Sequence, residues 1–168
     1  MVDLDRGVDH DGIRYLFNSL FDCTKIIGGA QEPFYAAASQ GRPALIHYRE
    51  DFAESALHEI AHWSLADSDQ RRLSDYGHRY VPPPRSLMEQ RNFFAAELPV
   101  QALERVLACA AGIEFRVSVD DFNPEFAPIS RQFEKAVQAH EPVTLDWLRT
   151  EQGERACRFL RALPGGSA

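Results

Sequence analysis

The sequence lacks three features that would place it in common classes of protein. Cysteine is scarce: Cys23, Cys109 and Cys157 are odd in number and far apart, so they suggest neither a disulfide framework nor a CxxC metal site. The longest apolar runs, such as residues 106–113, are too short to span a bilayer, and residues 1–10 have no apolar signal core. Acidic residues outnumber basic ones, 25 to 18, which argues against direct binding to nucleic acid. We therefore expect a cytoplasmic protein that contacts neither membranes nor nucleic acids directly.

The remaining composition is typical of one globular domain. A chain of 168 residues with 45% hydrophobic and 26% charged residues can bury a substantial core. We expect an α+β fold, namely a single, mainly helical domain with a small β-sheet. This domain spans residues 11–163, between a flexible segment 1–10 and a disordered tail 164–168. The hydrophobic spacing predicts helices at 11–22, 51–65, 88–111, 125–140 and 144–163, and strands at 24–27, 32–35, 44–48 and 115–119.

The most informative stretch is L-H-E-I-A-H-W at residues 57–63, which contains an HExxH motif. On a helix, His58 and His62 are one turn apart and point the same way, so both imidazoles can reach one metal ion. Glu59 lies beside that ion, where it could handle a proton as the catalytic residue. An apolar stripe lies nearly opposite the histidines, which predicts that the helix is in the middle of the fold. Its members are Ala53, Leu57, Ile60 and Ser64.

A third ligand must come from another position in the chain. Glu54 precedes His58 by one turn, but three ligands in a row on one straight helix splay away from one ion. A second helix is more suggestive, because its residues 93, 97, 101 and 104 share one stripe that places carboxylates among apolar side chains. We favour Glu97, next to which Pro99 should distort the helix. Glu104 could be a second carboxylate near the ion, which would allow a two-metal site. The other nearby candidates are Asp75 and His78.

The ligand types alone leave the reaction open. Two histidines and one carboxylate form the facial arrangement of non-haem Fe(II) oxygenases, but the same set holds catalytic zinc in peptidases. In a zinc metallopeptidase of the HExxH…E type, Glu59 would take a proton from the metal-bound water. A non-enzymatic, metal-stabilised binding domain is the third possibility. From these residues alone, the peptidase is favoured.

The segments around the motif change which function is favoured, because together they resemble the bacterial elongation factor P hydroxylase family. The resemblance covers residues 13–163 and rests on H-E-I-A-H-W, R-R-L-S-D-Y-G-H-R-Y, E-L-P-V-Q-A-L-E and C-A-A-G-I-E-F-R-V-S-V-D-D. It implies a hydroxylase that acts on the β-lysylated lysine side chain of its partner, translation elongation factor P. It also implies one divalent ion, Fe(II), held by His58, His62 and Glu97, although zinc could be bound in the protein as purified.

The resemblance also suggests residues that contact the substrate. Asp75, Gly77 and Tyr80 match the family pattern D-[FY]-G-x-x-Y, and we expect Asp75 and Tyr80 to bind the substrate. We expect the same of Glu104, because it lies on one of the two helices that form the site. One departure lies beside the proposed ligand. In the family the proline follows the ligand glutamate by three positions, whereas Pro99 follows Glu97 by two.

Overall fold

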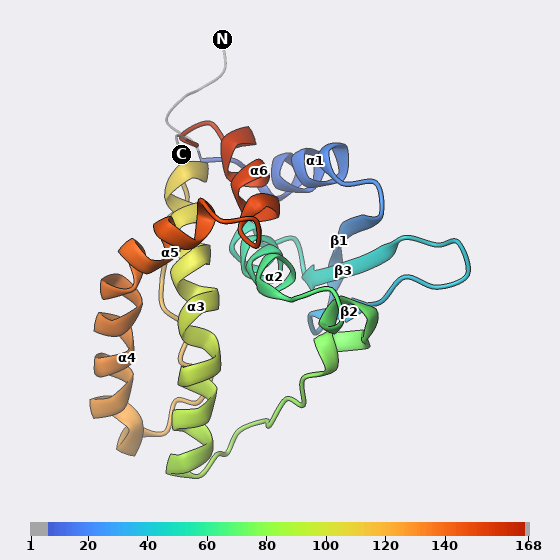
Figure 1. Ribbon diagram of the computed structural model, residues 1–168. Coiled ribbons are helices and arrows are strands. Elements are labelled where there is room, and N and C mark those ends of the chain that lie inside the picture. Colours follow the sequence, from blue (N-terminus) through green and yellow to red (C-terminus); the bar gives the residue numbers. More distant parts are fainter. Residues whose placement is uncertain (1–6, 167–168) are drawn as a thin grey trace.

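The computed structural model describes residues 7–166 and has the predicted mainly helical fold with a small sheet (Figure 1). The three strands come early in the chain and the helices dominate the rest. The strands are β1 (Thr24–Ala30), β2 (Phe34–Ala36) and β3 (Ala44–Arg49). The α-helices are α1 (His10–Leu20), α2 (Ala53–Leu65), α3 (Leu87–Ala111), α4 (Ala127–Ala139), α5 (Glu141–Leu148) and α6 (Glu154–Ala162). Three short 3-10 helices are η1 (Gln70–Arg72), η2 (Ser74–Gly77) and η3 (Pro124–Phe126).

The sheet presents one buried face to the helices. Its strand order is β1-β3-β2, with β1 parallel and β2 antiparallel to the central strand β3. Along β3, Ala44, Ile46 and Tyr48 are buried and the alternate residues are more exposed, as the two-residue period of a strand requires. The buried side contacts α2, so the sheet supports the helix that carries the HExxH motif.

Helix α2 lies in the centre of the molecule, between the sheet and α3, with α1 and α6 packed above it (Figure 1). Leu57 and Ile60 are fully buried, as the predicted apolar stripe requires. Trp63 joins an aromatic cluster with Phe17 and Phe21 of the α1 region, with ring centroids 4.8–5.0 Å apart. Because apolar contacts surround most of this helix, its polar side chains must find partners on the α3 side.

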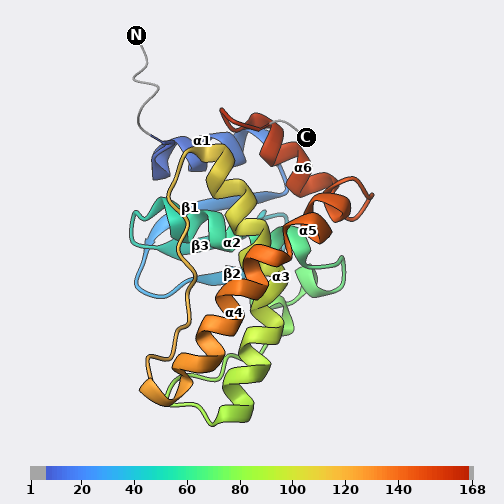
Figure 2. The ribbon, with the colours of Figure 1, turned by 90° about the vertical axis from the view of Figure 1, so that its left-hand side faces the viewer.

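Helix α3 is the longest element and has clear signals at both ends. Ser86 and Glu89 form a capping box at its start, and Gly112 ends it in the left-handed conformation, with φ of 70°. Pro99 lies inside the helix. The extended segment 113–123 runs back along α3, and α4 packs beside it (Figure 2). A second apolar cluster of Phe94, Phe133 and Val137 joins α3 to α4.

Two predictions about secondary structure were wrong. Residues 115–119 form no strand, because the backbone there bonds to a side chain: Ser118 N–H donates to the Gln101 amide oxygen at 3.0 Å. The predicted helix 144–163 is broken at residues 149–153 between α5 and α6. Gly153 allows this turn, since a Cβ there would lie 2.3 Å from the Trp147 carbonyl oxygen.

Both ends of the described chain contact the end of α3. Val8 N–H donates to the carbonyl of Ala111, and Gly165 N–H donates to that of Ala110, each at 2.8 Å. The predicted flexible segment 1–10 and tail 164–168 fall partly on residues 1–6 and 167–168, which lie outside the described residues. None of the helices in residues 7–166 combines the length and the apolar composition that crossing a lipid bilayer requires.

Candidate metal centre

Helix α2 places the two histidines of the motif on the side of the helix that faces α3. Their Nε2 atoms are 3.1 Å apart, and the two rings are nearly perpendicular, with centroids 4.8 Å apart. Both side chains keep about a quarter of their surface exposed, 25% for His58 and 26% for His62. The pair is therefore held inside the fold but can be reached from outside.

Helix α3 brings Glu97 to the same point. One carboxylate oxygen lies 3.3 Å from His62 Nε2 and the other lies 3.7 Å from His58 Nε2, while the side chain is only 10% exposed. Donor atoms bound about 2.1 Å from one ion, at angles between 90° and 109°, would lie roughly 3.0–3.4 Å apart. The histidine pair and the His62–Glu97 pair have this spacing, the His58–Glu97 separation is about 0.3 Å longer, and the three side chains form a group that could hold a metal ion.

Polar side chains of α3 hold this group in place. Glu104 accepts a hydrogen bond from His58 Nδ1 at 2.7 Å, which leaves the Nε2 lone pair of a neutral His58 free for a metal. The Gln101 amide donates to Glu97 at 3.1 Å and to the Ser118 carbonyl at 2.9 Å. The predicted stripe of residues 97, 101 and 104 therefore exists, and it faces the histidines.

The carboxylates set the charge of the metal-free site. Burial lowers the pKa of His58, but the hydrogen bond to Glu104 and the nearby carboxylate charges outweigh it and raise that pKa to about 10. Burial raises the pKa of Glu97, yet the hydrogen bond from His62 and the histidine charges bring it down to about 2. The carboxylates therefore favour the protonated form of His58 in the metal-free site, and a metal ion would compete with that proton.

Glu59 and Tyr76 lie next to this group. Glu59 is only 8% exposed, and burial raises the pKa of its carboxyl group. Tyr76 of η2 is 7% exposed, and its ring lies nearly parallel to that of His62, at 14° and 6.4 Å between centroids. The sequence prediction missed Tyr76, although its place between Asp75 and Gly77 in the D-Y-G segment could have pointed to it.

The other predicted substrate-binding residues have different positions. Asp75 accepts a hydrogen bond from the backbone N–H of Tyr35 at 2.9 Å, which ties η2 to β2. Tyr80 is 60% exposed; its hydroxyl donates to Asp120 at 2.7 Å, and the Arg85 guanidinium lies over its ring at 5.3 Å. Glu104 is the member of the predicted set that touches a candidate ligand.

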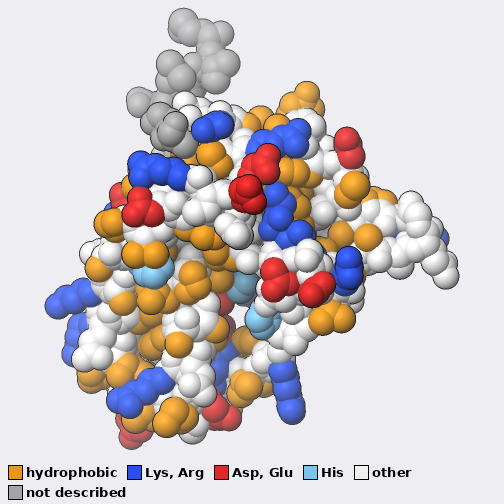
Figure 3. Space-filling view, viewed as in Figure 1, with side chains coloured by type: hydrophobic (Ala, Val, Ile, Leu, Met, Phe, Trp, Pro, Cys, Tyr) orange, Lys and Arg blue, Asp and Glu red, His pale blue; other side chains and the backbone are white. Residues whose placement is uncertain are grey.

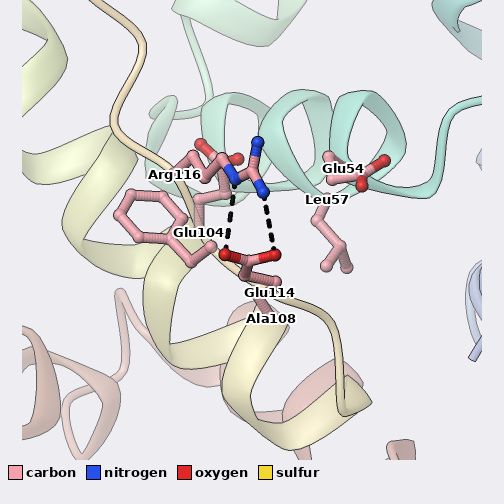
Figure 4. A pocket seen from close by; sticks show the side chains of 7 residues that line it. Glu54, Leu57, Glu104, Ala108, Glu114 and Arg116 are labelled. Carbon is pink, nitrogen blue, oxygen red and sulfur yellow. Dashed lines mark hydrogen bonds and ion pairs between the residues drawn. The ribbon is translucent and has the colours of Figure 1, made fainter. Parts of the chain in front are cut away.

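A pocket of about 320 Å³ opens beside Glu104, between α2 and the segment after α3 (Figure 4). Its polar lining is mostly acidic, with Glu54, Glu104 and Glu114, of which Glu114 pairs with Arg116 at 3.1 Å. Leu57, Ala108 and Phe115 form its apolar wall. In the space-filling view, histidine side chains reach the surface near the middle of the face shown (Figure 3).

Two histidines of one helix and a glutamate of a second are the donor set of mononuclear metal sites of the two-histidine, one-carboxylate class. A sequence model of elongation factor P hydroxylases matches residues 15–165, and the chain belongs to this family. A curated elongation factor P lysine hydroxylase of Haemophilus influenzae is 41% identical over 112 residues. The match covers 64% of this chain and 63% of the Haemophilus influenzae protein, so the chain spans less than two thirds of the length of that relative.

Proposed function

We propose that the protein is a metal-dependent hydroxylase that acts on the β-lysylated lysine side chain of elongation factor P. The observation that carries this proposal is that a member of the elongation factor P hydroxylase family gathers His58, His62 and Glu97 within 4.8 Å of one another. The Haemophilus influenzae relative is likewise named an elongation factor P lysine hydroxylase. The enzyme would act in the cytoplasm, and its catalytic domain would be a single unit of residues 11–163.

Each residue of the site would have a separate task. The three ligands would hold one divalent ion, Fe(II) in the working enzyme, although zinc could occupy the site after purification. When bound, iron would supply the oxidising chemistry that inserts oxygen into a C–H bond. By accepting from His58 Nδ1, Glu104 would leave Nε2 free to bind the ion. Glu59 would orient a polar group or hold a proton beside it.

Charge favours a cationic substrate arm. A β-lysylated lysine presents ammonium groups on a long side chain, and a partner protein must deliver that arm to the site. Glu54 and Glu114 lie on the exposed rim of the acidic pocket beside Glu104, where they would attract ammonium groups. The net charge of −7 has the sign that this attraction needs.

The decisive experiment compares the intact mass of elongation factor P from cells with and without this gene. We expect a gain of one oxygen atom only when the gene is present, and no gain with His62→Ala. An unchanged mass, with the β-lysyl group verified on both samples, would contradict the proposal. The zinc peptidase alternative instead predicts peptide cleavage that chelation abolishes and zinc restores. A non-enzymatic binding domain predicts metal-dependent stability with neither product.

A further inference from the structure

The side chain of Gln101 is fully buried between a candidate metal ligand and the backbone of another segment. Its Nε2 donates to Glu97 Oε2 at 3.1 Å and to the Ser118 carbonyl oxygen at 2.9 Å, and its Oε1 accepts from Ser118 N–H at 3.0 Å. Both N–H groups and the oxygen of the amide are therefore engaged. The contact with Glu97 belongs to a three-bond arrangement and is more than a bond between adjacent turns of one helix.

These three bonds allow one orientation of the Gln101 amide. If the amide were turned over, its oxygen would face two acceptors, the Glu97 carboxylate and the Ser118 carbonyl, and its NH2 group would face the Ser118 N–H. All three contacts would then be repulsive at a fully buried side chain, where unpaired polar groups are costly. The backbone of Ser118 therefore determines that an N–H group points at Glu97.

The extended segment 113–123 is also anchored just beyond this amide contact. Gln90, another fully buried glutamine of α3, donates to the Val119 carbonyl at 2.8 Å. The buried guanidinium of Arg85 pairs with Asp120 at 2.6 Å. The residues that follow the amide contact are thus held in place, so the segment can act as a fixed support.

The amide contact distinguishes the two oxygens of the Glu97 carboxylate. Oε2 accepts from Gln101 and is 3.7 Å from His58 Nε2, whereas Oε1 is 3.3 Å from His62 Nε2. The oxygen that the amide leaves free is therefore the one closer to a histidine nitrogen. Carboxylates that bind metals are commonly held by such a hydrogen bond, which orients them towards the ion.

We propose that Gln101 is a positioning residue for the metal ligand Glu97, and that the segment 113–123 sets its orientation through the backbone of Ser118. The amide holds Oε2, so that Oε1 is presented to the ion. Residues 114–116 of the same segment line the acidic pocket, so one piece of chain supports a ligand and walls the pocket (Figure 4). This inference rests on the proposed function, because it takes Glu97 as a ligand.

The test compares Gln101→Met with Gln90→Met in the full chain, since Met has the shape of Gln without its polar atoms. Gln90 is the matched control: it is equally buried on α3 and bonds the backbone of the same segment, but it lies roughly 10 Å along the helix from Glu97. Each variant leaves a carbonyl of the segment unpaired, so both should unfold at a lower temperature than the wild type. In a Zn(II) competition titration, Gln101→Met should bind about 10-fold more weakly and Gln90→Met less than about twofold.

Co(II) gives a readout that a change in stability alone would not move. Its visible absorption reports the number and arrangement of its ligands, so the spectrum of the Co(II)-loaded protein should change in Gln101→Met and stay unchanged in Gln90→Met. Wild-type Zn(II) affinity or a wild-type Co(II) spectrum in Gln101→Met would overturn the proposal, as would equal changes in the two variants.

Two substitutions of Ser118 test the support that the segment gives. Its side chain is exposed and both of its contacts with Gln101 use the backbone, so Ser118→Ala should bind Zn(II) as the wild type does. Ser118→Pro removes the N–H that fixes the amide and should bind about fivefold more weakly, the effect of one hydrogen bond. Equal affinities of the two variants would show that the segment does not set the orientation.

Glu97→Ala separates a failure of this inference from a failure of the proposed function. If Glu97→Ala binds Zn(II) as tightly as the wild type, Glu97 is no ligand, and the proposed metal centre fails together with this inference. If Glu97→Ala binds more weakly and Gln101→Met does not, the metal centre stands and the positioning role of Gln101 is refuted.

Discussion

Replacing Glu104 by Gln should change the affinity for a metal ion in a way that depends on pH. The carboxylate lies 2.7 Å from His58 Nδ1 and is only 11% exposed, so little solvent screens the interaction. Removing a carboxylate that hydrogen-bonds a ligand histidine typically weakens metal binding about 10- to 100-fold. The glutamine amide oxygen can still accept the proton, but without the charge that strengthens the bond.

The same carboxylate also favours the proton that competes with the metal. With a His58 pKa of about 10, protonation should weaken metal binding by a factor of roughly 300 at pH 7.5, and wild-type affinity should rise about tenfold per pH unit up to that value. In Glu104→Gln the pKa of His58 falls, so the affinity of the variant should stop rising at a lower pH. Glu104→Gln therefore weakens the support of the metal-bound His58 but also weakens the competition from a proton for that ring. These two effects on metal affinity oppose each other, and the effect of the proton is largest at low pH.

We therefore expect the affinity ratio of wild type to Glu104→Gln to be smallest near pH 6.5 and to rise with pH, reaching its full value of about 10- to 100-fold only above about pH 10, where His58 of the wild type is deprotonated. A Zn(II) competition titration with a chromophoric chelator measures it at each pH. Glu114→Gln is the matched control, because it removes the same charge from the same pocket but from an exposed residue. It should change the affinity less than about twofold. A ratio that is constant with pH, or an equal loss in Glu114→Gln, would show that Glu104 does not act through His58.

Three further predictions concern the same centre. Glu97→Ala should lower metal occupancy, measured per chain by elemental analysis, and full occupancy would remove Glu97 from the ligand set. The metal-free protein should lose stability as pH rises from about 6.5 towards 10, because the raised pKa of His58 stabilises the fold only while that ring is protonated. Urea unfolding of wild type and Glu104→Gln at several pH values checks this, and equal slopes would contradict it. Leu57→Ala, at a fully buried position, should cost about 2–5 kcal/mol, and metal at 100 times its Kd should restore about 2.7 kcal/mol in the same unfolding assay, provided that the variant still binds it.

The sequence predicted best what repeats along a helix. The four-residue spacing of His58 and His62 and the stripe of Glu97, Gln101 and Glu104 are properties of one helix each. In the structure these two sets of residues lie on the facing sides of α2 and α3. The contact between His58 and Glu104 is a property of two helices packed together. Its nature, a hydrogen bond to Nδ1 at 2.7 Å, could not be obtained from either helix alone.

The sequence-based predictions failed where a side chain, and not a neighbouring strand, is the hydrogen-bond partner of the backbone. Residues 115–119 have the composition of a strand, but Ser118 bonds to the Gln101 side chain rather than to another strand. Nothing in a local pattern identifies such a partner, which is 17 residues away in the chain. Tyr76 was missed for a related reason: its importance comes from a left-handed backbone and from two rings that stack on it, none of which has a periodic signal.

The polar contacts between α2 and α3 show what holds the candidate ligands in place. A polar interface of this kind costs stability compared with an apolar one, and it persists where function requires it. On the α3 side, the cost is reduced because Gln101 bonds both Glu97 and the Ser118 backbone, while Glu104 bonds His58. We infer that α3 has two tasks at this centre: it supplies Glu97, and through Glu104 it fixes the ring of His58, a candidate ligand on α2.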